Sequence, residues 1–164
     1  MAARRLSATL GALTEARVDF ILVGGMAAVV QGAPITTFDV DVVHSREHAN
    51  IERLLGVLES LDAFYRIQPE RRLKPSASHL AGSGHLNLTT RYGPLDLPGV
   101  VGHGRSYSDL LPHTTEIEIG DDLRVRVLNL ETQIAIKQEL AGDKDRLALP
   151  ILIRTLEEKR KKSS

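Results

Sequence analysis

Two aspartates at alternate positions, Asp39 and Asp41, are the residues of this chain best suited to chemistry. If the segment is a strand, both carboxylates lie on one face, and the neighbouring Phe38, Val40 and Val42 lie on the other. Two like charges about 7 Å apart along a strand repel one another unless a cation lies between them. Oxygen ligands of this kind suit magnesium, which is often held by one or two carboxylates together with substrate phosphates. The pair therefore indicates a divalent-cation site, with a solvated strand face as the simpler alternative.

A glycine pair, Gly24-Gly25, precedes the aspartates and directly follows an apolar run. Residues 20–23 are typical of a buried strand, and the two glycines end it with a turn that lets the backbone approach a ligand closely. Residues 26–31 then begin as a helix, whose first amides lack intrahelical partners and carry partial positive charge. The segment predicts a phosphate-binding turn, and an ordinary tight turn is the alternative.

Further candidate residues follow later in the chain. Asp96 lies between two leucines in a predicted strand, residues 93–97, so its side chain faces away from theirs. Other acids are possible third members of the site: Asp109, in a probable helix, and Asp121 and Asp122, at a turn. Lys137 and Lys144 lie in helical segments, where solvated charges are the alternative to phosphate ligands.

The order of these features resembles the nucleotidyltransferase superfamily of DNA polymerase β type. Its signature is a hydrophobic strand, Gly-Gly or Gly-Ser, a spacer, and Asp-x-Asp or Asp-x-Glu, with a third acid on a later strand. The chain looks most like the small bacterial proteins akin to the abortive-infection (AbiEii-type) nucleotidyltransferase toxins. In them a segment like residues 32–37 leads into the two aspartates. Ile35 departs from that branch, in which an arginine often precedes the first threonine.

The resemblance implies an α/β (α+β) nucleotidyltransferase fold, with a mixed β-sheet flanked by helices. It also implies transfer of a nucleoside monophosphate from a nucleoside triphosphate, ATP among the candidates, with release of pyrophosphate. Two Mg²⁺ ions would be held by the catalytic acids Asp39, Asp41 and Asp96. The residues implied to bind the nucleotide are Gly24, Gly25, Thr37, Lys137 and Lys144.

The acceptor in such a reaction is an RNA, a protein or a small molecule, and the enzyme would be the toxin of a toxin–antitoxin pair with a cognate partner protein. The alternative is a non-catalytic member of the same fold that binds a nucleotide or a partner, as an antitoxin or regulator would. The three acids favour the enzyme, whereas Ile35 and the short chain favour the binding protein.

Composition sets the bounds of these interpretations. The chain has 164 residues, which suits a nucleotidyltransferase core over residues 1–128 with a helical segment, residues 129–164, packed on it. Lysine plus arginine and aspartate plus glutamate each number 21, so no global field attracts nucleic acid. Absence of cysteine excludes disulfides and thiolate zinc sites and is compatible with the cytoplasm, the expected location. No apolar run reaches the roughly 20 residues needed to cross a bilayer, so no membrane contact is expected.

Hydrophobic periodicity predicts the elements that position these residues. The predicted helices are residues 4–17, 25–31, 46–60 and 130–141, the last capped by Asn129, and a further helix that breaks or kinks at Pro150. The predicted strands are residues 20–23, 38–43, 64–68, 86–90, 93–97, 115–119 and 123–128. Residues 69–83 are predicted to form a loop, and His44 and His48 to lie at the surface. The basic run 159–162 is a solvated helix end or, alternatively, a contact for RNA phosphates.

Overall fold

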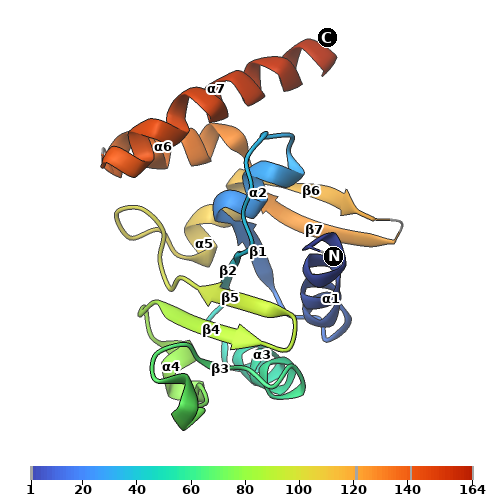
Figure 1. The fold of residues 1–164 in the computed structure, drawn as a ribbon, viewed down its shortest axis with the longest axis vertical. Helices are drawn as coiled ribbons and strands as arrows, with labels where there is room; N and C mark the ends of the chain where they lie inside the picture. Colours follow the sequence, from blue (N-terminus) through green and yellow to red (C-terminus); the bar gives the residue numbers. More distant parts are fainter. Residues whose placement is uncertain (1, 121, 141, 164) are drawn as a thin grey trace.

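A mixed β-sheet with helices around it organises the chain (Figure 1). The computed structural model describes residues 2–120, 122–140 and 142–163. The strands are β1 (Phe20–Val23), β2 (Val40–His44), β3 (Phe64–Tyr65), β4 (Leu86–Thr90), β5 (Gly93–Leu97), β6 (Thr114–Ile119) and β7 (Leu123–Leu128). The helices are α1 (Ala2–Glu15), α2 (Gly24–Val30), α3 (His48–Ser60), α4 (Ala77–Ala81), α5 (Tyr107–Leu110), α6 (Leu130–Leu140) and α7 (Asp143–Ser163), and short 3₁₀ turns are η1 (Pro69–Arg71) and η2 (Leu111–His113).

The seven strands of the described chain are ordered β3-β4-β5-β2-β1-β7-β6. β1 pairs in parallel with β7, and β2 pairs in parallel with β5. All other neighbouring pairs are antiparallel, including the predicted β4–β5 and β6–β7 hairpins. The α+β fold with a mixed sheet flanked by helices is thus confirmed.

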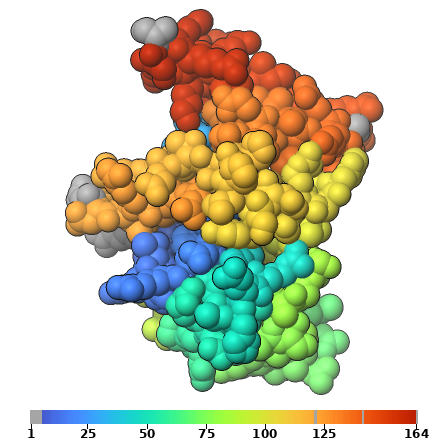
Figure 2. Space-filling model, turned by 180° about the vertical axis from the view of Figure 1, so that it is seen from behind, coloured from blue at the N-terminus to red at the C-terminus, as the bar shows by residue number. Residues whose placement is uncertain are grey.

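One face of the sheet carries the main hydrophobic core, against α1 and α3. Alternation along β2 and β5 directs Val42 and Leu95 into this core, where Leu10 of α1 and Leu54 of α3 are fully buried. Seen from behind, α3 (teal) lies next to α1 (blue), below the chain's C-terminal helices (Figure 2). The odd-numbered residue Asp41 and the even-numbered residue Asp96 consequently face the opposite side of the sheet.

The opposite face is covered only in part. Ile21 and Val43 pack there against Leu110 of α5 and Ile136 of α6 in a second, smaller core. On β4, Asn87 projects to this side and is exposed to solvent. Polar side chains therefore remain accessible over the β4–β5 half of the sheet.

The helices at the C-terminal end pack on α2. Ala28, Leu130, Ile134 and Leu152 form a third apolar cluster that joins α2, α6 and α7. Asn129 caps α6 as predicted, because its Oδ1 accepts a hydrogen bond of 2.9 Å from the Thr132 amide. None of the helices in the described ranges combines the length and the apolar composition needed to cross a membrane.

The sequence predicts a kink or a break at Pro150, and the break is wrong, because α7 continues through this residue to Ser163. A proline inside a helix removes one backbone hydrogen bond and costs about 3 kcal/mol. The helix is held on both sides of Pro150 by packing, since Leu149 and Leu152 both contact the third apolar cluster. Tertiary contacts here outweigh the local preference.

Two predictions for the chain around the sheet are also wrong. Phe38 was expected to share a strand face with Val40 and Val42, but β2 begins only at Val40, and Phe38 is 72% exposed. The antiparallel pairing with β1 ends at Val23 and Asp41, so strand alternation does not extend back to Phe38. Residues 69–83, predicted as a loop, contain η1 and α4, and Leu80 of α4 is fully buried.

His44 is buried, contrary to the predicted surface position, whereas His48 is exposed as expected. The His44 Nε2 donates a hydrogen bond of 2.8 Å to the Leu80 carbonyl, and its Nδ1 has no hydrogen-bond partner among the residues that the structure describes. Burial lowers the pKa of the imidazole, with a smaller effect from the charge of Arg46 and an opposing effect from the bond to Leu80.

We expect protonation of His44 to destabilise the fold. Because its pKa is lowered in the folded state, its contribution to stability is complete above about pH 6.5 and is lost as the pH falls toward the folded pKa. Urea unfolding at about pH 7.5 and about pH 5 should show a fall in the free energy of unfolding that is smaller in His44→Gln than in the wild type. The exposed His48→Gln should keep the wild-type fall, and an equal fall in His44→Gln would assign the acid sensitivity to another group.

Candidate functional site

Asp41 and Asp96 lie side by side on adjacent strands. The parallel pairing of β2 with β5 sets Asp41 opposite Asp96, and neighbouring strands are about 4.8 Å apart. Both side chains face away from the main core; Asp41 is half-buried and Asp96 is 8% exposed. The structure thus brings together two of the three predicted acids.

The third predicted acid, Asp39, lies just before β2 and is exposed. Its backbone amide donates a hydrogen bond of 3.4 Å to Thr37 Oγ1. Its charge still acts on Asp41, because it contributes to raising the pKa of that carboxyl. Asp39 therefore flanks the Asp41–Asp96 pair from the segment that precedes β2 rather than from the strand itself.

The glycine turn contacts the acid pair directly. Gly24 follows β1 with φ +71°, and a β-carbon built on it would lie 2.3 Å from Asp41 Oδ2. Only glycine combines this backbone conformation with so close an approach to a carboxylate. A β-carbon on Gly25 would contact Thr37 at 3.4 Å, so the turn also packs against the segment that leads to Asp39.

The Gly24→Ala substitution should lower the free energy of unfolding by about 2 kcal/mol or more, because it adds both left-handed strain and a clash with Asp41. Gly11→Ala is the matched control: it lies within α1 and has open space around it, so we expect a gain of about 0.5–1 kcal/mol. Urea unfolding of both variants measures the difference. A Gly24→Ala protein as stable as the wild type would contradict the contact.

Arg66, which sequence analysis missed, completes the row of polar side chains across the sheet. It forms an ion pair with Asp96, and its Nη1 donates to the Leu88 carbonyl at 2.6 Å. Its backbone amide donates to the Asn87 carbonyl at 3.1 Å, and Asn87 is in register with Asp96. An arginine after a short edge strand gives no distinctive sequence signal, and only the pairing of β3 with β4 brings it to the site.

The environment of Asp41 favours its neutral form. Burial raises its pKa most, a hydrogen bond to Asp96 and the negative charges of Asp96 and Asp39 raise it further, and Arg66 opposes the shift. Together these effects raise the pKa of Asp41 from 3.8 to about 7. Without a cation the protein therefore holds a carboxyl that resists ionisation at neutral pH.

We expect Asp41→Asn to stabilise the metal-free protein at alkaline pH. Because the folded pKa is raised, the contribution of Asp41 to stability is complete below about pH 4 and is lost as the pH rises through about 7. The free energy of unfolding at about pH 8 should rise by about 1–2 kcal/mol, a value reduced for solvent screening, and the gain should vanish near pH 4. Asp122→Asn, at an exposed turn, should change little at either pH, and the same result for Asp41→Asn would rule out the raised pKa.

Two buried glutamines connect the glycine turn to the C-terminal helices, and sequence analysis did not identify their role. Gln133 of α6 donates from Nε2 to the Gly24 carbonyl at 2.9 Å. Gln31, at the end of α2, donates from Nε2 to Gln133 Oε1 at 3.3 Å and to the Leu128 carbonyl at 2.9 Å. A polar residue at a buried helix position is the signal that could have found them.

The two lysines predicted to bind the nucleotide have different surroundings in the structure. Lys137 Nζ lies 3.0 Å from Asp145 Oδ1, so the residue joins α6 to α7 through an ion pair. Lys144 is exposed in the first turn of α7. Neither lysine has a described contact with the acid pair.

The carboxylates fit magnesium by their chemistry. Asp41 and Asp96 offer neighbouring oxygen donors, and a divalent cation would relieve the repulsion that raises the pKa of Asp41. Within the described residues, no three or more carboxylate or imidazole groups are already gathered as a metal site. A bound ion would therefore rest on Asp41 and Asp96, with Asp39 approaching from the preceding segment.

Two solved structures resemble this chain in fold over most of their length. One is TM1012 from Thermotoga maritima, described as a proposed nucleotidyltransferase, with a TM-score of 0.59, 15% identity, and coverage of 92% of this chain and 91% of that one. Another is the lincosamide antibiotic adenylyltransferase LnuA, in its lincomycin-bound form, with a TM-score of 0.58, 15% identity, and coverage of 91% and 94%. This is the nucleotidyltransferase fold.

Within the nucleotidyltransferase fold, the sequence itself gives no closer assignment. No protein-family description matches the chain, and no curated protein matches it by sequence. Neither structural neighbour is described as an abortive-infection protein, so the resemblance to that branch stays a prediction.

Proposed function

We propose that the protein transfers a nucleoside monophosphate from a nucleoside triphosphate to an acceptor. The observation that carries this proposal is the pair Asp41–Asp96, in register on parallel strands and in contact with the Gly24 turn. The nucleotidyltransferase fold adds support, since the neighbour LnuA is an adenylyltransferase. The proposed reaction forms a bond between an acceptor oxygen and the α-phosphorus, breaks the α–β phosphoanhydride bond, and releases pyrophosphate.

In the proposed mechanism the chain's own residues bind and orient the reactants. Asp41 and Asp96, with Asp39, would hold magnesium, which when bound supplies positive charge to the reacting phosphate. The Gly24-Gly25 turn has no side chains, so its backbone can lie close to the triphosphate. Asp96 would accept the proton of the acceptor hydroxyl, and Arg66, which forms an ion pair with Asp96, would hold that side chain in position.

The second candidate is a nucleotide- or partner-binding protein without turnover. The ion pair of Arg66 with Asp96 favours it, because one oxygen of that carboxylate already accepts from a cation.

The acceptor of the enzyme would be an RNA, a protein or a small molecule, and LnuA is described with an antibiotic bound. A toxin role would require that expression of the wild-type protein arrests growth and that expression of Asp41→Asn does not.

The decisive assay uses each α-labelled nucleoside triphosphate with magnesium and separate pools of RNA, protein and small molecules. We expect label transfer by the wild type and a loss of roughly a hundredfold or more in Asp41→Asn and Asp96→Asn, because each removes a carboxylate that would hold the magnesium on which the reacting phosphate depends. Asp122→Asn, which removes an exposed carboxylate at a turn, should keep full activity.

The pool that takes up the label identifies the acceptor class. Magnesium-dependent binding of a triphosphate without transfer, lost in Asp41→Asn, would support the non-catalytic candidate instead. Absence of both transfer and binding would contradict the assignment of the site.

A further inference from the structure

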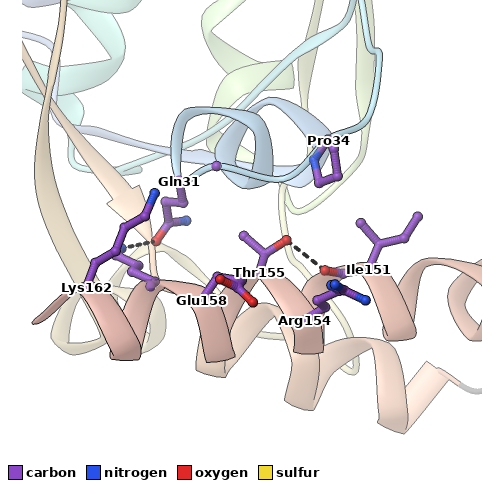
Figure 3. Close-up of a pocket in the computed structure, with 9 residues that line it drawn as sticks. Gln31, Pro34, Ile151, Arg154, Thr155, Glu158 and Lys162 are labelled. Carbon is purple, nitrogen blue, oxygen red and sulfur yellow. Dashed lines mark hydrogen bonds between the residues drawn. The ribbon is translucent and has the colours of Figure 1, made fainter. Parts of the chain in front are cut away.

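A pocket separate from the acid pair opens between α7 and the segment that follows α2 (Figure 3). Its volume is about 320 Å³, at the small end of the range of sites that hold small molecules. Gln31, at the inner end of the pocket, ends α2, whereas Gly24 at the other end of α2 contacts Asp41. Seven helical residues span about 10 Å, so a small ligand in this pocket does not reach the acid pair.

One side of the pocket is apolar. Pro34 and Ile151 line it, and Thr155 adds a methyl group, because its Oγ1 is used in a 2.7 Å hydrogen bond to the Ile151 carbonyl. Gly32 has no side chain and φ +107°, and a β-carbon there would lie 3.8 Å from Thr155 Cγ2. The glycine therefore leaves open the space between the two segments.

The other side of the pocket carries excess positive charge. Lys159 and Lys162 line it near Gln31, and Lys159 Nζ donates to the neutral Gln31 Oε1 at 3.3 Å. Arg154 adds a third positive charge at the end of the pocket near Ile151 (Figure 3). Glu158 also lines the pocket but pairs with Lys161 at 3.8 Å. Among the described residues, Arg154 and Lys162 form no ion pair, and the chain as a whole has no net charge. The excess is therefore a local property of this pocket.

We propose that this pocket binds a small organic anion that carries one acidic group on an apolar body. The acidic group lies near Lys159 and Lys162, and the apolar body lies against Thr155, Pro34 and Ile151, where Arg154 adds a third positive charge to the pocket (Figure 3). Residues 151, 155, 159 and 162 recur at helical spacing, so one face of α7 presents both halves of the site.

The pocket is also connected to the Gly24 turn. Lys159 donates to Gln31, Gln31 donates to Gln133, and Gln133 donates to the Gly24 carbonyl. An anion that draws Lys159 away from Gln31 would disturb this chain of hydrogen bonds at its first member. The inference goes beyond the proposed transferase function and does not depend on it, because binding is measured without a nucleotide.

The test is to titrate the full chain with 1-naphthalenesulfonate and, separately, with its neutral counterpart 1-naphthalenemethanol. Backbone-amide and side-chain NMR signals report binding at each step. We expect the sulfonate to shift signals of Ile151, Thr155 and the Gln31 side-chain amide, and the neutral compound to bind at least about fivefold more weakly. The double variant Arg154→Gln/Lys162→Gln should weaken sulfonate binding about fivefold or more, as two exposed charge contacts would. Arg146→Gln, an exposed α7 arginine outside the pocket, should bind like the wild type.

Equal binding of the two compounds, or equal binding by the double variant and Arg146→Gln, would overturn the proposal. Shifts spread over the surface rather than confined to the pocket would also overturn it. A single-stranded RNA that shifts the same residues while the sulfonate does not would show that the basic face serves nucleic acid instead. Arg154 and Lys162 are both exposed, so we expect the double variant to fold. An unchanged NMR spectrum for the rest of the chain would verify this.

Discussion

The structure depends on holding two carboxylates side by side where they repel one another. Strand pairing fixes Asp41 opposite Asp96, and burial prevents water from screening their charges fully. Such a pair is unfavourable by itself, so the surrounding chain must supply the stability. It does so on the other face of the same strands, where Val42 and Leu95 pack into the main core against α1 and α3.

Two features of the structure accommodate these neighbouring carboxylates. Arg66 brings a positive charge to Asp96 from the sheet edge, and the Gly24 turn allows the backbone to approach Asp41 with no side chain between them. Both leave the site open toward solvent on the partly covered face. A charge-strained pair of carboxylates of this kind supports the proposal that the site binds a cation and a phosphate.

The C-terminal helices support the site through the Gly24 turn and have no described contact with the acid pair itself. Gln133 reaches the Gly24 carbonyl from α6, and Gln31 ties α2 to β7 and to Lys159 of α7. Buried glutamines need every polar group satisfied, which makes the arrangement of α2, α6 and α7 specific. The same packing of α7 on the segment after α2 creates the basic pocket and holds the helix together across Pro150.

Local pattern by itself determined much of the site. The period of two within each strand correctly turns Asp41 away from Val40 and Val42 and Asp96 away from Leu95 and Leu97, because it depends on neighbouring residues alone. The apolar run before Gly24-Gly25 likewise predicts β1, its turn and α2 correctly. The glycine in left-handed conformation and the Asn129 cap are likewise local. Phe38 marks the limit of this reasoning, since alternation holds only as far as a strand is paired.

Only the tertiary structure decided which distant residues meet. Arg66 reaches Asp96 because β3, β4 and β5 pair in sequence order, and His44 is buried because α4 covers the end of β2. Lys137 turns to Asp145 because α7 packs on α6. Each of these contacts joins two segments, and neither segment's own sequence indicates which other segment it will contact. Strand register and helix packing determine these contacts, and both are set by burial over the whole chain.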